Sequence, residues 1–151
     1  MRFDYSLDTT ASPEQARAAF IDFGPRRLEI WGSSLSPKKY ELREHGDDWA
    51  VVKEGSTGFR IWVLLRYDWS EPGTVRWTLI DSGHCRRGTG CITISPGPDG
   101  GSHLEVEIAH FGPRGVTGAP TLLLQGLLGP IVFPRVWRSA LNRIAEWEPG
   151  G

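Results

Sequence analysis

The chain has 151 residues, a formal net charge of −1 and an isoelectric point of about 6.4. This length predicts one domain over residues 1–151, which can bury roughly 70% of its unfolded surface without a structural metal or disulfide. The nearly balanced charge excludes the basic footprint of a nucleic-acid-binding protein, and the 7 tryptophans suit a cavity or an interface.

The start of the chain lacks the features of an export signal. Asp4 and Asp8 lie where a signal peptide would carry its apolar region. The longest apolar tract, Leu122–Phe133, is interrupted by glycine and proline and is too short to cross a bilayer of about 30 Å. We therefore predict a cytoplasmic monomer or homodimer without stable membrane insertion.

The first residues predict a strand followed by a capped helix. Apolar side chains alternate with polar ones, as in a half-buried strand, at Phe3, Tyr5 and Leu7. Ser12 can cap the next helix, Pro13 fits its first position, and Gln15 completes a capping box. We expect a helix over Pro13–Asp22 and a second short helix or turn over Arg26–Trp31.

A run of short strands is expected in the middle of the chain. The candidates are Tyr40–Glu44, Trp49–Glu54, Phe59–Trp69, Val75–Asp81, Gly90–Ser95 and Ser102–Phe111. The segments between them are short and rich in turn formers, so we expect antiparallel neighbours rather than crossover connections.

The register of the hairpin over residues 59–81 decides which face lines the interior, because a shift of one residue exchanges the two faces. A two-residue turn would place Tyr67 on the same face as Thr78. A three-residue loop would place it with Trp77 and Leu79, and the apolar pattern favours this loop. The charged side chains of the hairpin's first strand then form a solvated face: Arg60, Arg66 and Asp68.

The C-terminal region predicts a long helix with an interrupted start. An amphipathic stripe includes Val136, Trp137, Ala140, Leu141, Ile144 and Ala145. Pro130 and Pro134 predict a kink or break upstream. The part before Pro130 is apolar all round, which indicates burial on several sides or a partner. We expect Gly112–Ala119 to be a mobile connection into the helix.

This order of elements resembles the START/birch-pollen-allergen-like (SRPBCC) superfamily, in particular its bacterial polyketide cyclase/dehydrase type. The opening Ala11–Ala16 and the segments Arg66–Gly73 and Val75–Thr78 carry the resemblance. It implies an α+β helix-grip fold, in which a seven-stranded antiparallel sheet wraps around a long C-terminal helix, with one or two short helices after the first strand. A cavity is expected between sheet and helix. The superfamily includes lipid carriers and aromatase/cyclases and has no single catalytic motif.

Few residues could carry acid–base chemistry. His110 is in phase with the inner apolar residues of the last strand, Asp81 is in phase with those of its own strand, and Tyr67 offers a phenol. His84, Cys85 and Cys91 do not have the spacing of a zinc motif, even with His103 or His110 added. We predict no metal and no cofactor.

Three functions remain open. The first is the binding or carrying of a hydrophobic small molecule (lipid, polyketide or isoprenoid-like) in a cavity whose walls include Trp31, Tyr67, Trp69, Trp77, His110 and Trp137. The second is a polyketide aromatase/cyclase that uses His110, Tyr67 and Asp81, which requires at least two of them to converge on one point. The third is an interaction protein that docks through Leu122–Phe133 or the side of Trp62.

Overall fold

The computed structural model describes residues 1–57 and 60–147. The strands are β1 (Arg2–Thr9), β2 (Glu41–His45), β3 (Trp49–Gly55), β4 (Trp62–Asp68), β5 (Thr74–Ser82), β6 (Cys85–Pro96) and β7 (Ser102–Pro113). The helices are α1 (Pro13–Ile21), α2 (Arg26–Trp31) and α3 (Gly115–Trp147), with a 3₁₀ turn η1 (Pro98–Gly100). Phe59, part of a predicted strand, and residues 148–151 lie outside the described residues.

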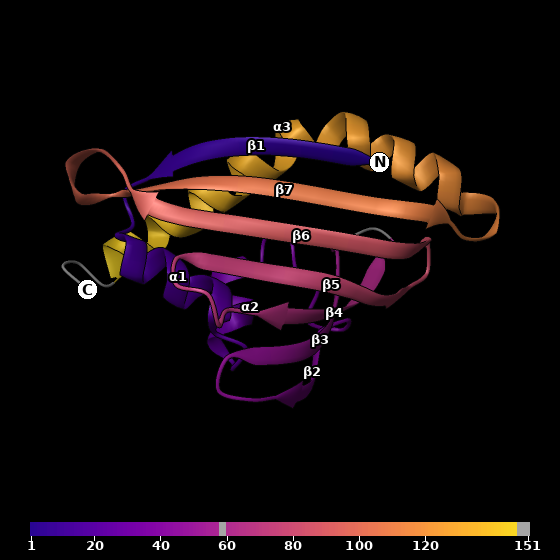
Figure 1. Cartoon of the computed structure of the whole chain (residues 1–151), viewed down its shortest axis with the longest axis horizontal. Coiled ribbons are helices and arrows are strands. Elements are labelled where there is room, and N and C mark those ends of the chain that lie inside the picture. Colours follow the sequence, from indigo (N-terminus) through magenta and orange to yellow (C-terminus); the bar gives the residue numbers. More distant parts are fainter. Residues whose placement is uncertain (58–59, 148–151) are drawn as a thin grey trace.

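Within the described residues the strands form one seven-stranded sheet in the order β1-β7-β6-β5-β4-β3-β2, and every neighbouring pair is antiparallel. In Figure 1, α1, α2 and the yellow second half of α3 lie behind the sheet, and the orange first half of α3 stands beyond the β1 edge. The predicted α+β helix-grip architecture is therefore confirmed. The core lies between the inner face of the sheet and the helices.

The helix after β1 begins where the sequence predicts. Ser12 Oγ accepts from the Gln15 amide at 3.1 Å, and the Gln15 side chain accepts from the Ser12 amide at 2.9 Å. This reciprocal capping box satisfies two amides that have no partner within the helix. It fixes the entry into α1, whose buried side carries Ala16, Ala19 and Phe20.

The register of the β4–β5 hairpin agrees with the longer loop. Tyr67 pairs with Trp77, and Leu65 pairs with Leu79. One step further Leu64 pairs with Asp81, so β5 carries an extra residue there, which is a bulge at the half-exposed Ile80. The bulge reverses the alternation. Asp81 therefore lies on the outer face of the sheet, and its predicted inner position is wrong.

Strand β6 is longer than the predicted strand Gly90–Ser95. The segment Arg86–Gly90, which precedes or begins that predicted strand, lies within β6. The two glycines in its first half, Gly88 and Gly90, are typical of turns but lie within the strand. A Cβ atom on Gly90 would overlap the Trp77 ring, and one on Gly88 would come within 2.7 Å of the His110 ring. Neither glycine therefore marks a turn here. Each makes room for an aromatic side chain from a neighbouring strand.

The segment between β7 and α3 is more regular than predicted. Instead of a mobile connection over Gly112–Ala119, β7 continues to Pro113 and α3 begins at Gly115. Gly112 and Gly115 have φ angles of 70° and 68°, which turn the chain sharply. Helix α3 also continues through Pro130 and Pro134, so of the predicted kink or break the break is wrong and the kink stays a prediction. Packing of the helix on both sides of the prolines, by Leu122 and by Leu141, compensates for the missing amides.

Helix α3 is long and apolar enough to cross a membrane by length and composition alone, although the tract was predicted to be too short. In this fold it packs along the sheet instead. Its inward side contributes Leu122, Ala140, Leu141 and Ile144 to the core. Only 17% of the residues in the most apolar stretch of α3 are buried. The outer side of this stretch therefore has no covering element within the described chain.

Gly90→Ala should lower the free energy of unfolding by about 1–3 kcal/mol, because the added methyl group overlaps the Trp77 ring and forces repacking. Urea unfolding measures the change. Thr89→Ala, at the adjacent outward-facing position of β6, is the matched control and should cost less than about 1 kcal/mol. Equal losses in the two variants would contradict the close packing of Trp77 on Gly90.

Candidate functional site

A cavity of about 200 Å³ lies between the inner face of the sheet and the helices. It takes walls from α1, α2, α3 and strands β3 to β7. Most of its lining is aromatic or aliphatic, and the polar side chains come from Arg27, Ser34, Glu54, Ser56, Tyr67, His110 and Gln125. A site with apolar walls and a few fixed polar groups is typical of small-molecule binding.

The aromatic wall is held by ring contacts and one hydrogen bond. Trp31 stacks on Phe20 with ring centroids 5.0 Å apart, and its Nε1 donates to the Ala19 carbonyl at 3.1 Å. Trp137 of α3 meets Phe20 at 5.2 Å and Trp31 at 6.0 Å. On the sheet side, Tyr67 lies 5.8 Å from Trp77. Because the indole donor of Trp31 is already satisfied, this wall presents ring faces rather than donors.

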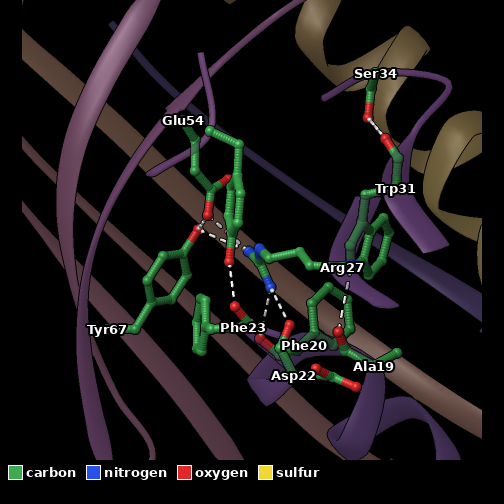
Figure 2. A network of polar contacts seen from close by, with 10 residues as sticks. Ala19, Phe20, Asp22, Phe23, Arg27, Trp31, Ser34, Glu54 and Tyr67 are labelled. Carbon is green, nitrogen blue, oxygen red and sulfur yellow. Dashed lines mark hydrogen bonds and ion pairs between the residues drawn. The ribbon is translucent and has the colours of Figure 1, made fainter. Parts of the chain in front are cut away.

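The first polar group of the cavity centres on a buried arginine. Arg27 Nη2 donates to Glu54 Oε1 at 2.8 Å and to Tyr67 Oη at 3.3 Å, and Nη1 donates to the Phe20 carbonyl at 3.1 Å. The Tyr67 hydroxyl donates to the same Glu54 oxygen at 3.0 Å. Figure 2 shows the guanidinium between the Tyr67–Glu54 side and the carbonyls of Phe20 and Asp22 at the end of α1.

The charges of this Arg27–Glu54–Tyr67 network are fixed by its surroundings. Burial is the largest effect on Arg27 and opposes its charge, but Glu54, Tyr67 and Tyr40 together outweigh burial, so the pKa of Arg27 is raised and the side chain stays charged. Burial and the Glu54 carboxylate raise the pKa of Tyr67 well above its usual value. Tyr67 is therefore a permanent hydrogen-bond donor near neutral pH and is not a base.

The second polar group joins two histidines through one amide. His84 Nε2 and His110 Nδ1 each lie 3.2 Å from Gln125 Oε1. Burial lowers the pKa of both histidines, so both imidazoles are neutral near pH 7. If each donates its N–H to the shared oxygen, the other nitrogen of each ring is an acceptor. His84 Nδ1 meets Ser82 Oγ at 3.2 Å, and His110 lines the cavity.

The side-chain donor atoms of His84, Cys85 and His110 lie within 4.8 Å of one another. Neutral imidazole and thiolate are ligands that zinc accepts. Three of the four ring nitrogens, however, are engaged by Gln125 and Ser82, and burial raises the pKa of the Cys85 thiol. Cys91 lies elsewhere on β6, half-buried. The absence of a metal site stays a prediction.

The structure brings most of the predicted site residues together. Those that line the cavity are Trp31, Tyr67, Trp77, His110 and Trp137. Trp69 does not line it and instead stacks on Phe23, with ring centroids 5.6 Å apart. Asp81 forms an ion pair with Arg114 at 2.7 Å on the surface. Of the three acid–base candidates, Tyr67 and His110 therefore line the cavity and Asp81 does not.

Five polar residues of the cavity were missed in the sequence: Arg27, Ser34, Glu54, Ser56 and Gln125. Two of them left a signal. Glu54 follows the buried Ala50 and Val52 at alternate positions of β3, which places it on the inner face. Arg27 is in helical phase with the buried Ile30 and Trp31. Gln125 lies in an apolar stretch, where only the structure shows that it meets His84 and His110.

No protein-family model and no curated protein sequence matches the chain. Solved structures do match over nearly its whole length. The protein TTHA0849 from Thermus thermophilus has a TM-score of 0.77 at 12% identity and covers 98% of this chain and 99% of its own. A START superfamily protein from Mycobacterium smegmatis has a TM-score of 0.73 at 13% identity, with 97% and 99% covered.

An aromatase/cyclase from Streptomyces sp. R1128 has a TM-score of 0.72 at 11% identity and covers 100% of this chain and 98% of its own. The chain thus has the START/birch-pollen-allergen-like helix-grip fold. At these identities the likeness shows the fold alone, and the function has to be argued from the cavity.

Glu54→Leu should lower the free energy of unfolding by about 3–5 kcal/mol, because it leaves the buried Arg27 charge without its partner. Chemical denaturation measures the loss. The double variant Arg27→Met/Glu54→Leu removes both charges and should recover most of the stability. A double variant as unstable as the single one would show that the loss comes from packing and not from an unpaired charge.

Stability should fall as the pH drops below about 6.5, the ordinary pKa of histidine. Burial lowers the pKa of His84 and His110, so the unfolded chain binds more protons in this range and acid favours unfolding. Thermal unfolding between about pH 7 and about pH 5.5 measures this slope, which His110→Gln should make shallower.

His103→Gln is the matched control for the pH experiment. Asp8 raises the pKa of the exposed His103, so His103 contributes stability that is present at low pH and is lost as the pH rises. Its removal cannot make the acid-side slope shallower. The same change of slope in both variants would contradict the assignment to buried neutral histidines.

Proposed function

We propose that this protein binds a hydrophobic small molecule in the cavity between the sheet and α3. The observation that carries the proposal is the cavity itself: an apolar, largely aromatic wall with two polar groups whose protonation is fixed. Burial of an apolar ligand surface there gains about 25 cal/mol per Å², and the polar groups orient one end of the ligand.

The volume of the cavity favours a compact ligand. A cavity of about 150 Å³ in another protein holds one benzene molecule, so about 200 Å³ suits a molecule of one to two rings or a short isoprenoid. A polyketide fragment also fits this description. A long acyl chain would need the walls to open, so among the three candidate classes a small polyketide-derived ring compound or an isoprenoid is favoured over a lipid.

The polar groups favour a ligand that carries an oxygen atom. Arg27 lines the cavity and its Nε has no hydrogen-bond partner among the described residues, so it is a donor for a carbonyl, phenol or carboxylate oxygen. The Tyr67 proton is already donated to Glu54. The neutral His110 adds an acceptor nitrogen for a hydroxyl group. The Arg27 charge is already paired with Glu54, so a neutral or singly charged head group is better matched than a phosphate.

An aromatase/cyclase is the second candidate, because Tyr67 as a proton donor and His110 as a base share one cavity. Tyr67 and His110 lie on β4 and β7, three strands apart. The backbones of these two strands are therefore roughly 14 Å apart along the sheet, at a strand spacing of about 4.8 Å. Each side chain is also held by its own partners. This separation favours binding over convergence on one reacting atom.

The first experiment is native mass spectrometry of the purified protein, followed by titration with a hydroxynaphthalene while tryptophan fluorescence is recorded. Saturable 1:1 binding is expected. Val63→Trp, which fills part of the cavity from β4, should weaken binding about tenfold or more. Leu64→Trp, the adjacent residue on the outer face, is the control and should bind as the wild type does.

Absence of any bound molecule together with no saturable binding of the aromatic probe would contradict the proposal. Binding that Val63→Trp and Leu64→Trp leave equally unchanged would place the probe outside the cavity. Turnover of a polyketide mimic that is lost in His110→Gln would favour the cyclase instead.

A further inference from the structure

The first half of α3 exposes an unusually large apolar face. Val116 is 96% exposed, Leu123 66% and Leu127 63%. The same half of the helix also exposes Leu124, Leu128, Ile131 and Val132 to about half of their area. Large contiguous apolar surfaces on a single molecule mark sites of contact with a partner or a membrane.

This exposed face belongs to a segment that carries no charge at all. None of the residues from Gly115 to Pro134 is ionisable, over roughly 30 Å of helix at about 1.5 Å per residue. Two of its three polar side chains are also occupied: Thr121 donates to the Thr117 carbonyl within the helix, and Gln125 faces the two histidines. The face thus offers apolar area and few directional contacts.

Arginines lie at both ends of this uncharged segment. Arg135 and Arg138 follow it and are exposed. Before it, Arg86 lies beside Gly112 at the corner between β7 and α3, and Arg87 pairs with the half-exposed Phe111. An apolar helix face with basic side chains at its ends matches the acyl region and the anionic head groups of a lipid bilayer.

We propose that the exposed face of α3, from Val116 to Val132, docks this protein on the surface of an anionic lipid bilayer. A protein partner, including a second copy of this chain, would be expected to meet a polar, hydrogen-bonding rim around an apolar centre. The segment lacks such a rim along its length, whereas a bilayer requires none. The helix lies flat in the interface, because its opposite side packs on the sheet.

The packing of α3 agrees with this orientation. Its inward side presents Gly126 to Met1 and Gly129 to the Phe3 ring, so β1 packs closely against it. Leu122 is buried on the same side, while Gln125, Phe133 and Trp137 line the cavity. The docking therefore needs no unfolding of the helix. It goes beyond ligand binding and does not depend on it.

The test is co-sedimentation of the full chain with vesicles of phosphatidylcholine containing phosphatidylglycerol, and with vesicles of phosphatidylcholine alone. The wild type should sediment with the anionic vesicles and lose most of this binding in high salt. Leu123→Gln/Leu127→Gln should weaken binding about tenfold or more, because it removes two exposed apolar side chains without changing charge.

Ile80→Gln is the matched control. Ile80 is 50% exposed on the outer face of the sheet, away from α3, and its variant should bind vesicles as the wild type does. Sedimentation velocity without lipid completes the test. Failure of the wild type to bind either vesicle would overturn the proposal. A dimer that Leu123→Gln/Leu127→Gln dissociates, in a protein that does not bind vesicles, would assign the face to a second copy.

These outcomes are separate from those for the cavity. Val63→Trp should bind vesicles normally while losing the hydroxynaphthalene probe, and Leu123→Gln/Leu127→Gln should bind the probe normally. Loss of vesicle binding in Val63→Trp would contradict the placement of the docking surface on the outer side of α3.

Discussion

The cavity depends first on the ion pair between Arg27 and Glu54. A charged guanidinium buried among aromatic rings is costly unless a carboxylate and several acceptors surround it. Here Glu54, Tyr67 and the Phe20 carbonyl supply those contacts, and the Phe23 ring centroid lies 4.3 Å from the guanidinium carbon. The network joins α2, β3, β4 and the end of α1, so that α2 is held above the sheet and does not collapse onto it.

The sheet provides the other half of this arrangement. Glycines at two inner positions of β6 leave room for Trp77 and His110, whose rings spread over the neighbouring strand. The bulge at Ile80 removes Asp81 from the interior and leaves it paired with Arg114 at the surface. As a result the cavity lining contains the Arg27–Glu54 ion pair and the neutral imidazole of His110, and no carboxylate base contributed by β5.

The sequence predicted the fold better than the site. Alternation in β1, the capping box at Ser12 and the short connections are local signals, and they are sufficient for the helix-grip order. The bulge in β5 and the cross-strand roles of Gly88 and Gly90 depend on neighbouring strands, so the alternation rule failed at Asp81 and the predicted strand Gly90–Ser95 was shorter than β6. Glu54 was accessible to the same rule, whereas the contact between Gln125 and two histidines required tertiary structure.

Helix α3 serves two environments because both of its sides are apolar. A core helix of ordinary amphipathic pattern would turn charged residues outward, yet the first half of α3 has none. The inward side already closes the cavity with Phe133 and Trp137, and the outward leucines leave about half or more of their area outside the packing of this chain. The core contacts of α3 are made by its inward side and do not depend on these leucines. This arrangement makes the cavity wall and the proposed bilayer contact two sides of one helix, separated by the helix diameter of roughly 10 Å.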